Sequence, residues 1–441
     1  MDLVSLGRGL LGMAVLLALA FAFSNNKRRV DWRLVGIGIL IQIVLAVFLL
    51  RGDDMATVFS PLGWPRAFFD GVSYFFGVKM LEAVNAGAGF MFGPLALSPG
   101  EEGSLGGFFA FQVLPTIVFF AALTSVLYHL GVLQLIVKGL AWAVSRALRT
   151  SGAESLSVVA DIFVGQTEAP LVIRPYLKGM TQSELLGVMA GGMATIAGGV
   201  LVAYIQILGG AFAEAQGMAL DPARVLFARQ LLAASVMAAP AAILFSKILI
   251  PETEVPETMG KVRVPVERTE ENVIGAAAAG ASDGLKLALN VGAMLVAFVA
   301  LIALINIGLD AVAGLFGYTT SLEMIFGVVF APVAWVIGVP WVDAVEVGSL
   351  LGTKVVLNEF VAYLSFGEMV GANALSAKSI TIATFALCGF ANFSSIAIQI
   401  GGTGSLAPER VPDLVRLGIR ALFAGTLANL LTATIAGVVA G

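Results

Sequence analysis

Eight long stretches of this sequence contain no charged residue. They cover residues 9–26, 34–50, 103–137, 185–213, 230–246, 287–309, 379–408 and 421–441. A helix crosses the hydrocarbon core of a bilayer with about 20 apolar residues, and that core requires the backbone to satisfy its own hydrogen bonds. The pattern therefore predicts an all-α polytopic membrane protein with eight transmembrane helices, in contact with a lipid bilayer.

The composition agrees with this class and excludes others. Hydrophobic residues make up 59% of the chain and charged residues 12%, whereas about 25% is usual for a soluble domain. The single cysteine, Cys388, excludes a secreted disulfide scaffold, and a net charge of −4 without a basic tract argues against a nucleic-acid partner. The sequence has no zinc spacing, P-loop, GxSxG or Rossmann fingerprint that would indicate an ATPase or a soluble-type enzyme.

The positive charges predict how the chain is oriented. Of the 25 Lys and Arg residues, 17 lie in the segments 27–33, 138–178, 247–286 and 410–420. Positively charged loops stay on the cytoplasmic side. We therefore expect a multi-pass protein of the cell (inner) membrane with both termini outside the cytoplasm.

Two apolar regions contain charges and a break, and do not fit simple spans. Residues 151–176 contain the sequence GQTEAP, and residues 342–366 contain Leu357-Asn358-Glu359. Non-helical backbone is tolerated at membrane depth only inside protein or beside a water-filled cavity. We interpret both as re-entrant helical hairpins, each preceded by an interfacial helix at 132–148 or 324–339.

The two hairpins begin similar successions of segments, which predicts an internal repeat. In each unit a hairpin is followed by a broken helix, 185–207 or 379–401, and then by one more span. The first unit opens with a span running inward and the second with a span running outward, so the repeat is inverted. We expect the two broken helices to unwind at Gly191-Gly192 and at 389–392, since glycine weakens helix interiors. Inverted repeats with interrupted helices are typical of secondary transporters, which bind substrate near the midplane.

Acidic and polar residues at the breaks are the candidate site. Glu168 and Glu359 lie at equivalent breaks, where a carboxylate requires a polar cavity or a partner. Gln166 and Thr167 precede Glu168, and an amide, a hydroxyl and a carboxylate together favour a neutral polar substrate. Asp161, Thr195 and the carbonyls of a broken helix suggest a site for a hard cation.

Three motifs resemble those of the concentrative nucleoside transporters. They are DIFVGQTEAP at 161–170, NEFVAY at 358–363 and CGFANFSSIA at 388–397. The resemblance covers nearly the whole chain. It implies Na⁺- or H⁺-coupled nucleoside uptake by a homotrimer, with a scaffold domain and a transport domain that moves like an elevator.

The resemblance also assigns residues and domains. The family's nucleoside-contacting positions fall on Gln166, Thr167, Glu168 and Val200 for the base, and on Glu359, Phe390, Asn392 and Ser395 for the ribose. Its sodium site falls on Asp161, Val164, Thr167, Thr195 and Ile196. The expected division is scaffold at 1–130 and 285–309, cytoplasmic linker at 251–284, and transport domain at 131–250 and 310–441.

One position departs from the family pattern. Asp161 stands where the sodium-coupled bacterial members have Asn. A full negative charge can tighten Na⁺ binding or carry a proton instead. We expect Na⁺ as the coupling ion and keep H⁺ as the alternative, with uridine as a test substrate and no organic cofactor.

Two other functions remain as alternatives. A hairpin-type transporter of another polar solute, such as a carboxylate, has the same architecture, although two glutamates in the cavity would repel anions. An intramembrane enzyme that uses Glu168 and Glu359 as an acid–base pair would release an altered product. We expect a transporter and not an enzyme.

Overall fold

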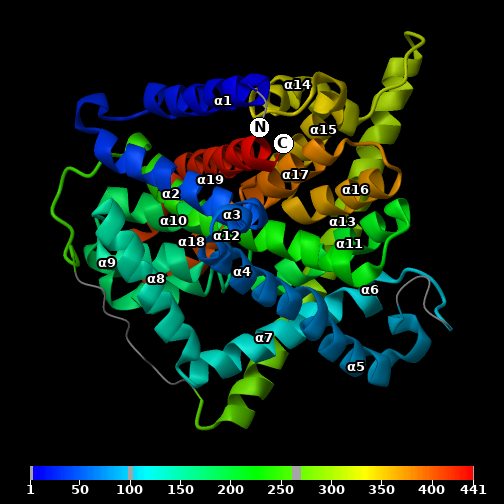
Figure 1. Cartoon of the computed structure of the whole chain (residues 1–441), viewed down its shortest axis with the longest axis horizontal. Helices are drawn as coiled ribbons and strands as arrows, with labels where there is room; N and C mark the ends of the chain where they lie inside the picture. The colour runs from blue at the N-terminus through cyan, green and yellow to red at the C-terminus, as the bar shows by residue number, and fades with distance from the viewer. Residues whose placement is uncertain (1–2, 98–102, 261–269, 441) are drawn as a thin grey trace.

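Helices joined by short turns build the whole described part of the chain. The computed structural model describes residues 3–97, 103–260 and 270–440, and within these ranges the only β interaction is one isolated bridge. Figure 1 shows the helices gathered around a central group that includes α12 and α19. Part of the predicted linker, residues 261–269, lies outside the described residues.

The first quarter of the chain forms a series of helices that ends at His129. Its elements are α1 (Leu3–Ala22), η1 (Lys27–Arg29), α2 (Trp32–Leu50), α3 (Gly52–Val58), η2 (Ser60–Gly63), α4 (Trp64–Tyr74), η3 (Phe75–Lys79), α5 (Met80–Phe92), η4 (Gly93–Ala96), α6 (Phe109–Gln112) and α7 (Leu114–His129).

Two similar series of elements follow, separated by one very long helix. The first series is α8 (Val132–Leu148), α9 (Gly152–Ala160), η5 (Ala169–Gly179), α10 (Gln182–Ala194), α11 (Gly198–Gln216) and α12 (Leu220–Leu249). The long helix is α13 (Val273–Gly314). The second series is α14 (Leu322–Val336), η6 (Trp341–Asp343), α15 (Ala344–Val356), α16 (Glu359–Gly371), α17 (Ala377–Leu387), α18 (Phe393–Leu406), η7 (Pro408–Arg410) and α19 (Val411–Ala440).

Most of the predicted spans coincide with long apolar helices. In the described residues, seven helical stretches are long and apolar enough to cross a membrane. The eighth prediction, 379–408, corresponds to two shorter helices, α17 and α18, separated by an irregular segment. The prediction of a helix over 132–148 matches α8, and the prediction over 324–339 overlaps α14.

The predicted position of one break and the predicted start of one helix are wrong. Gly191 and Gly192 lie inside α10, which ends at Ala194, and the chain leaves the helix only at 195–197. A Cβ on Gly192 would lie 2.9 Å from Cβ of Gln166, so this glycine permits close packing and does not unwind the helix. Helix α13 begins at Val273, inside the range predicted as linker, because the Asn272 side chain caps its first turn.

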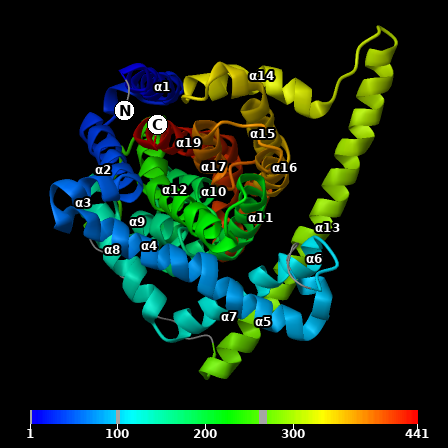
Figure 2. The same cartoon turned by 45° about the vertical axis from the view of Figure 1, so that its right-hand side comes forward.

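Burial separates a packed centre from helices at the periphery. In the most apolar window of α10–α11, 94% of the residues are buried, against 17% for α13. Figure 2 shows α13 as a long column beside the central group, crossed near its lower end by α7. Gly280 and Gly284 let the two helices meet, since a Cβ on Gly280 would lie 2.6 Å from the Ala121 carbonyl oxygen.

Candidate functional site

Four irregular segments in the packed centre, and the first turns of the helices that follow them, carry the predicted site residues. They lie between α9 and η5 (161–168), between α10 and α11 (195–197), between α15 and α16 (357–358), and between α17 and α18 (388–392). Helices that stop inside a protein leave backbone groups without intrahelical partners. The polar side chains of these segments lie beside the helix ends, where free backbone N–H and C=O groups need hydrogen-bond partners.

Glu359 is held at the start of α16. Asn358 caps this helix by accepting a hydrogen bond from the Val361 amide, which fixes Glu359 in the first turn. The Oε2 atom of Glu359 accepts a hydrogen bond from Asn392 Nδ2 at 2.7 Å. Its Oε1 atom accepts one from the Tyr204 hydroxyl at 3.3 Å. The carboxylate is buried and has two neutral donors, and its remaining acceptor capacity can serve a hydroxyl-bearing ligand.

Asn392 joins this carboxylate to α18. Its Oδ1 atom caps the helix by accepting from the Ser395 amide at 2.9 Å, and it also accepts from the Ser394 hydroxyl at 2.7 Å. Because both ends of the Asn392 amide are engaged, the side chain has one orientation. The cap places Ser395 one turn into the helix, beside the first hairpin.

Gln166 connects the tip of the first hairpin to the same helix. Its Nε2 atom donates to the Ser395 hydroxyl at 3.1 Å, and its Oε1 atom accepts from Gln399 Nε2 at 3.0 Å. Gln399 also donates to the Met189 carbonyl at 3.0 Å, so it ties α18 to α10. The structure therefore brings Gln166, Glu359, Asn392 and Ser395 into one hydrogen-bonded group.

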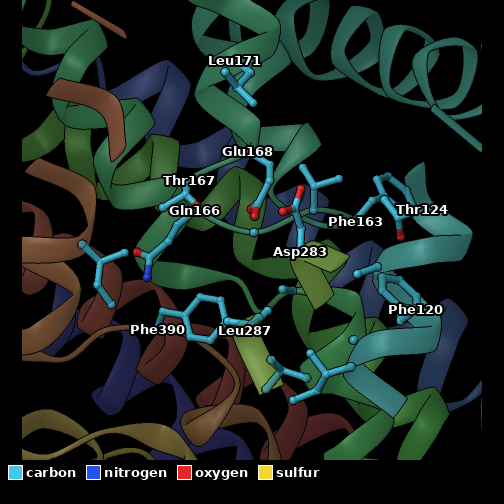
Figure 3. A pocket seen from close by; sticks show the side chains of 18 of the residues that line it. Phe120, Thr124, Phe163, Gln166, Thr167, Glu168, Leu171, Asp283, Leu287 and Phe390 are labelled. Atoms are coloured by element: carbon cyan, nitrogen blue, oxygen red, sulfur yellow. The ribbon is translucent and has the colours of Figure 1, made fainter. Parts of the chain in front are cut away.

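A cavity of about 1080 Å³ opens beside this group, at the upper end of the size usual for a ligand site. The predicted substrate residues all line it: Gln166, Thr167, Glu168, Val200, Glu359, Phe390, Asn392 and Ser395. Its opposite wall comes from α7 and α13, including Phe120, Thr124, Asp283, Leu287 and Asn290. In Figure 3 Gln166, Thr167 and Phe390 lie on one side, while the carboxylates of Glu168 and Asp283 point toward one another.

Asp161 is the least satisfied polar side chain of the predicted ion site. The residue is 1% exposed, and neither carboxylate oxygen has a hydrogen-bond partner. It faces the last turn of α10, since a Cβ on Gly192 would lie 3.5 Å from its Oδ1 atom. A buried carboxylate without a partner is costly unless a proton or a cation neutralises it.

The other predicted ion ligands belong to the same two breaks. Val164 and Thr167 follow Asp161 in the first hairpin, and Thr195 and Ile196 follow α10. The Thr195 hydroxyl donates to the Gly191 carbonyl at 2.9 Å, which leaves its oxygen lone pairs free to accept or to coordinate. Among the described residues, no group of three or more His, Cys, Asp and Glu side chains could hold a metal ion. A cation beside Asp161 would therefore depend on hydroxyl and carbonyl oxygens as well.

The cavity wall from α7 and α13 was missed in the sequence, and so were two residues bonded to the polar group, Gln399 and Tyr204. Gln399 lies one helical turn after Ser395, and Tyr204 lies one turn after Val200. The signal was the spacing of four residues, which places each pair on one helix face. Both missed residues lie inside regular helices, away from the motifs that marked the breaks.

These features define a class of protein. An all-helical membrane protein whose interrupted helices gather polar side chains at one cavity has the architecture of a secondary transporter.

Comparisons with known proteins identify the family. Three family models match the chain: Na⁺ dependent nucleoside transporter N-terminus over 11–95, Nucleoside recognition over 110–211, and Na⁺ dependent nucleoside transporter C-terminus over 230–437. The nucleoside permease NupC of Helicobacter pylori is 42% identical over 436 residues, covering 98% of this chain and 97% of the permease. The chain belongs to the concentrative nucleoside transporter family.

Other members of the family include animal and structurally known proteins. Sodium/nucleoside cotransporter 1 of Mus musculus is 39% identical over 442 residues, covering 97% of this chain and 63% of the mouse protein. The transporter CNTnw, solved in an inward-facing substrate-bound state, is 44% identical with a TM-score of 0.85, covering 99% of this chain and 98% of CNTnw.

Proposed function

We propose that this protein is a secondary active symporter that imports nucleosides into the cell, coupled to the Na⁺ gradient. The observation that carries the proposal is the group of Gln166, Glu359, Asn392 and Ser395 at the cavity, next to the unpartnered carboxylate of Asp161. One part supplies hydrogen bonds for a polar solute, and the other requires a positive charge.

The polar group fits the two parts of a nucleoside. Glu359 can accept hydrogen bonds from two ribose hydroxyls, since a carboxylate has about four acceptor sites. Gln166, with Thr167 and Glu168 beside it, would contact the edge of the base, and Val200 and Phe390 would contact its faces. Asn392 and Ser395 would complete the ribose side. The relatives named as nucleoside permease and sodium/nucleoside cotransporter support this substrate class.

Asp161 is the basis for the coupling ion. Sodium would bind its carboxylate together with oxygens from Val164 and Thr167 in the same break and from Thr195 and Ile196 in the break after α10. The Na⁺-dependent family models and the mouse sodium/nucleoside cotransporter support Na⁺. The same unpartnered carboxylate makes H⁺ the second candidate, because one proton would also neutralise it.

The movement we propose is elevator-like. The two series of elements that begin at α8 and α14 would move as a transport domain, past a scaffold that contains α7 and α13. The cavity supports this division, because its walls come from both parts. The long apolar face of α13 would contribute to a homotrimer in the inner membrane, with both chain termini outside the cytoplasm.

Uptake into proteoliposomes tests the function and the ion together. Radiolabelled uridine uptake is measured with an inward Na⁺ gradient at equal pH, and with an inward H⁺ gradient without Na⁺. We expect accumulation only with the Na⁺ gradient. Accumulation driven by the pH gradient alone would replace Na⁺ with H⁺ as the coupling ion.

The other functions are tested with the same preparation. A thermal shift with dicarboxylates but not with uridine would indicate a transporter of another solute. Chromatography of the accumulated label identifies the product, and chemically altered uridine would indicate an intramembrane enzyme.

A further inference from the structure

Lys354 is a buried charge for which the transport mechanism above has no role. It lies in the last turn of α15 and is 2% exposed. Its ammonium group donates to the Ala386 carbonyl and to Asn429 Oδ1, both at 2.8 Å. Neither partner is a carboxylate. The buried carboxylate of Glu359 lies near enough for its charge to act on this ammonium, but it is not among the hydrogen-bond partners. An ionisable side chain inside a membrane domain is costly and is a candidate for function.

Asn429, on α19, extends the contact to both interrupted helices. Its Nδ2 atom donates to the Ala194 carbonyl and to the Cys388 carbonyl, each at 2.7 Å. Ala194 is the last residue of α10, and Cys388 directly follows α17. We call Lys354 and Asn429 the clasp. It contacts the ends of the first halves of the two broken helices.

The chemistry of helix ends explains why a cation and an amide fit there. The last carbonyls of a helix have no intrahelical donor, and together they carry a partial negative charge. The clasp supplies donors to three such carbonyls, those of Ala386, Ala194 and Cys388. The breaks also bond directly, since the Phe390 amide donates to the Thr195 carbonyl at 3.2 Å.

Gly389 lies where the two breaks pack most closely, and no larger residue fits there. A Cβ on Gly389 would lie 2.7 Å from the Ala194 carbonyl oxygen and would also contact Asn429 Oδ1. Only glycine allows the two breaks to approach as they do. The two breaks are therefore fixed against one another at a single point.

Each break leads to a different part of the site. The break after α10 contains Thr195 and Ile196, two of the proposed ion ligands, and Asp161 faces the last turn of α10 at Gly192. The break after α17 ends at Asn392, which holds Glu359. We propose that the clasp is the coupling element between the ion site and the nucleoside site, with Lys354 and Asn429 as positioning residues. This inference rests on the proposed Na⁺-coupled nucleoside transport.

Nucleoside affinity with and without Na⁺ tests the proposal. The dissociation constant of uridine is measured calorimetrically on the purified full-length protein, in Na⁺ and in choline, and the ratio of the two values is the coupling factor. In Lys354→Gln we expect this ratio to fall about fivefold or more, mainly through weaker binding in Na⁺. By reciprocity, the effect of uridine on Na⁺ affinity should fall by the same factor. Lys138→Gln, an exposed lysine on α8, is the matched control and should keep the wild-type ratio.

A second variant keeps the proposal testable if the first does not fold. Asn429→Asp retains an acceptor for Lys354 but has no N–H donors for Ala194 and Cys388. We expect the same loss of coupling. A ratio within about twofold of wild type, in either variant that remains monodisperse, overturns the role of the clasp. A wild-type ratio near one, without Na⁺-driven uptake, overturns the proposed function and the clasp together.

Discussion

The two hairpins place opposite charges beside the two interrupted helices. In the first, Asp161 faces the last turn of α10 with both carboxylate oxygens unpartnered. In the second, Lys354 reaches the end of α17 and has a carbonyl and an amide oxygen as partners. Both residues are at most 2% exposed. The first hairpin needs a positive charge from outside the protein, and the second already contains one.

This difference suggests different roles for the two hairpins in the proposed mechanism. A site whose charge is satisfied within the protein is stable without a ligand, whereas an unpaired carboxylate favours the state in which a cation is bound. The first half is therefore the half we expect to sense the ion. In the proposed site, Glu359 and Asn392 of the second half would bind the ribose, and Gln166 of the first half would contact the base.

The largest expected effect comes from removing the unpaired charge. Asp161→Leu should lower Na⁺-driven uridine uptake roughly 100-fold or more, which corresponds to about 2.7 kcal/mol. In the absence of Na⁺ the melting temperature should stay the same or rise, because the change removes an uncompensated buried charge. Uptake assays in proteoliposomes and thermal unfolding in choline measure the two effects.

The response of the melting temperature to Na⁺ is the control for this prediction. Wild type should be stabilised by Na⁺, and Asp161→Leu should not, because a ligand stabilises only the state that binds it. Equal stabilisation of both proteins would mean that the ion binds elsewhere. The claim that the first hairpin binds the coupling ion through Asp161 would then be wrong.

Changing the carboxylate of the second hairpin should affect the solute more than the ion. Glu359→Gln removes the charged acceptor while Asn392 and Tyr204 remain in place. We expect the KM for uridine to rise roughly 10- to 150-fold, since a hydrogen bond to a charged group contributes about 1.5–3 kcal/mol. Initial uptake rates over a range of uridine concentrations measure the change.

Glu368→Gln is the matched control, because Glu368 lies on the same helix and is exposed. It should keep the wild-type KM. A normal KM in Glu359→Gln would show that the ribose hydroxyls do not bind this carboxylate.

The sequence predicted the architecture where one physical signal was dominant. The charge-free runs located the long spans, and the apolar segment at 132–148 coincides with α8. The break in the first broken helix was misplaced because glycine was taken as a helix breaker. In the folded protein, Gly191 and Gly192 serve helix packing: a Cβ on Gly191 would lie 2.9 Å from a Val158 methyl carbon. Tertiary packing overrode the local helix propensity.

The residues of the candidate site likewise divide into those that the sequence predicted and those that only the fold revealed. Residues in the irregular segments, such as Gln166 and Asp161, were predicted because polar groups at breaks inside an apolar chain stand out in the sequence. Tyr204 and Gln399 lie in regular helices, and their partners are more than 150 residues away in sequence. Lys354 lies five residues before Glu359, and its contacts with Ala386 and Asn429 are visible only in the fold. Hydrogen bonds between residues so far apart in the sequence produce no local sequence pattern.

A smaller effect is expected where the two halves contact one another through an amide. Gln399→Leu leaves Gln166 Oε1 and the Met189 carbonyl without their donor. The KM for uridine should rise roughly fivefold, since a neutral hydrogen bond contributes about 1 kcal/mol. A double-mutant cycle with Gln166→Leu checks the mechanism, because two residues that act through one bond give non-additive losses. Additive losses would show that Gln399 acts independently of Gln166.

The smallest effect should come from the long hydrogen bond between Tyr204 and Glu359. Tyr204→Phe removes a neutral donor at 3.3 Å but keeps the ring, which stacks on Tyr363 with centroids 3.9 Å apart. We expect the KM for uridine to rise only about two- to fivefold. The matched change Tyr363→Phe, which removes a hydroxyl bonded to the Thr384 carbonyl, should lower the melting temperature and leave the KM unchanged. If Tyr204→Phe impaired transport as strongly as Glu359→Gln, the Tyr204 hydroxyl would bind the solute directly, and the first half would contact the ribose as well as the base.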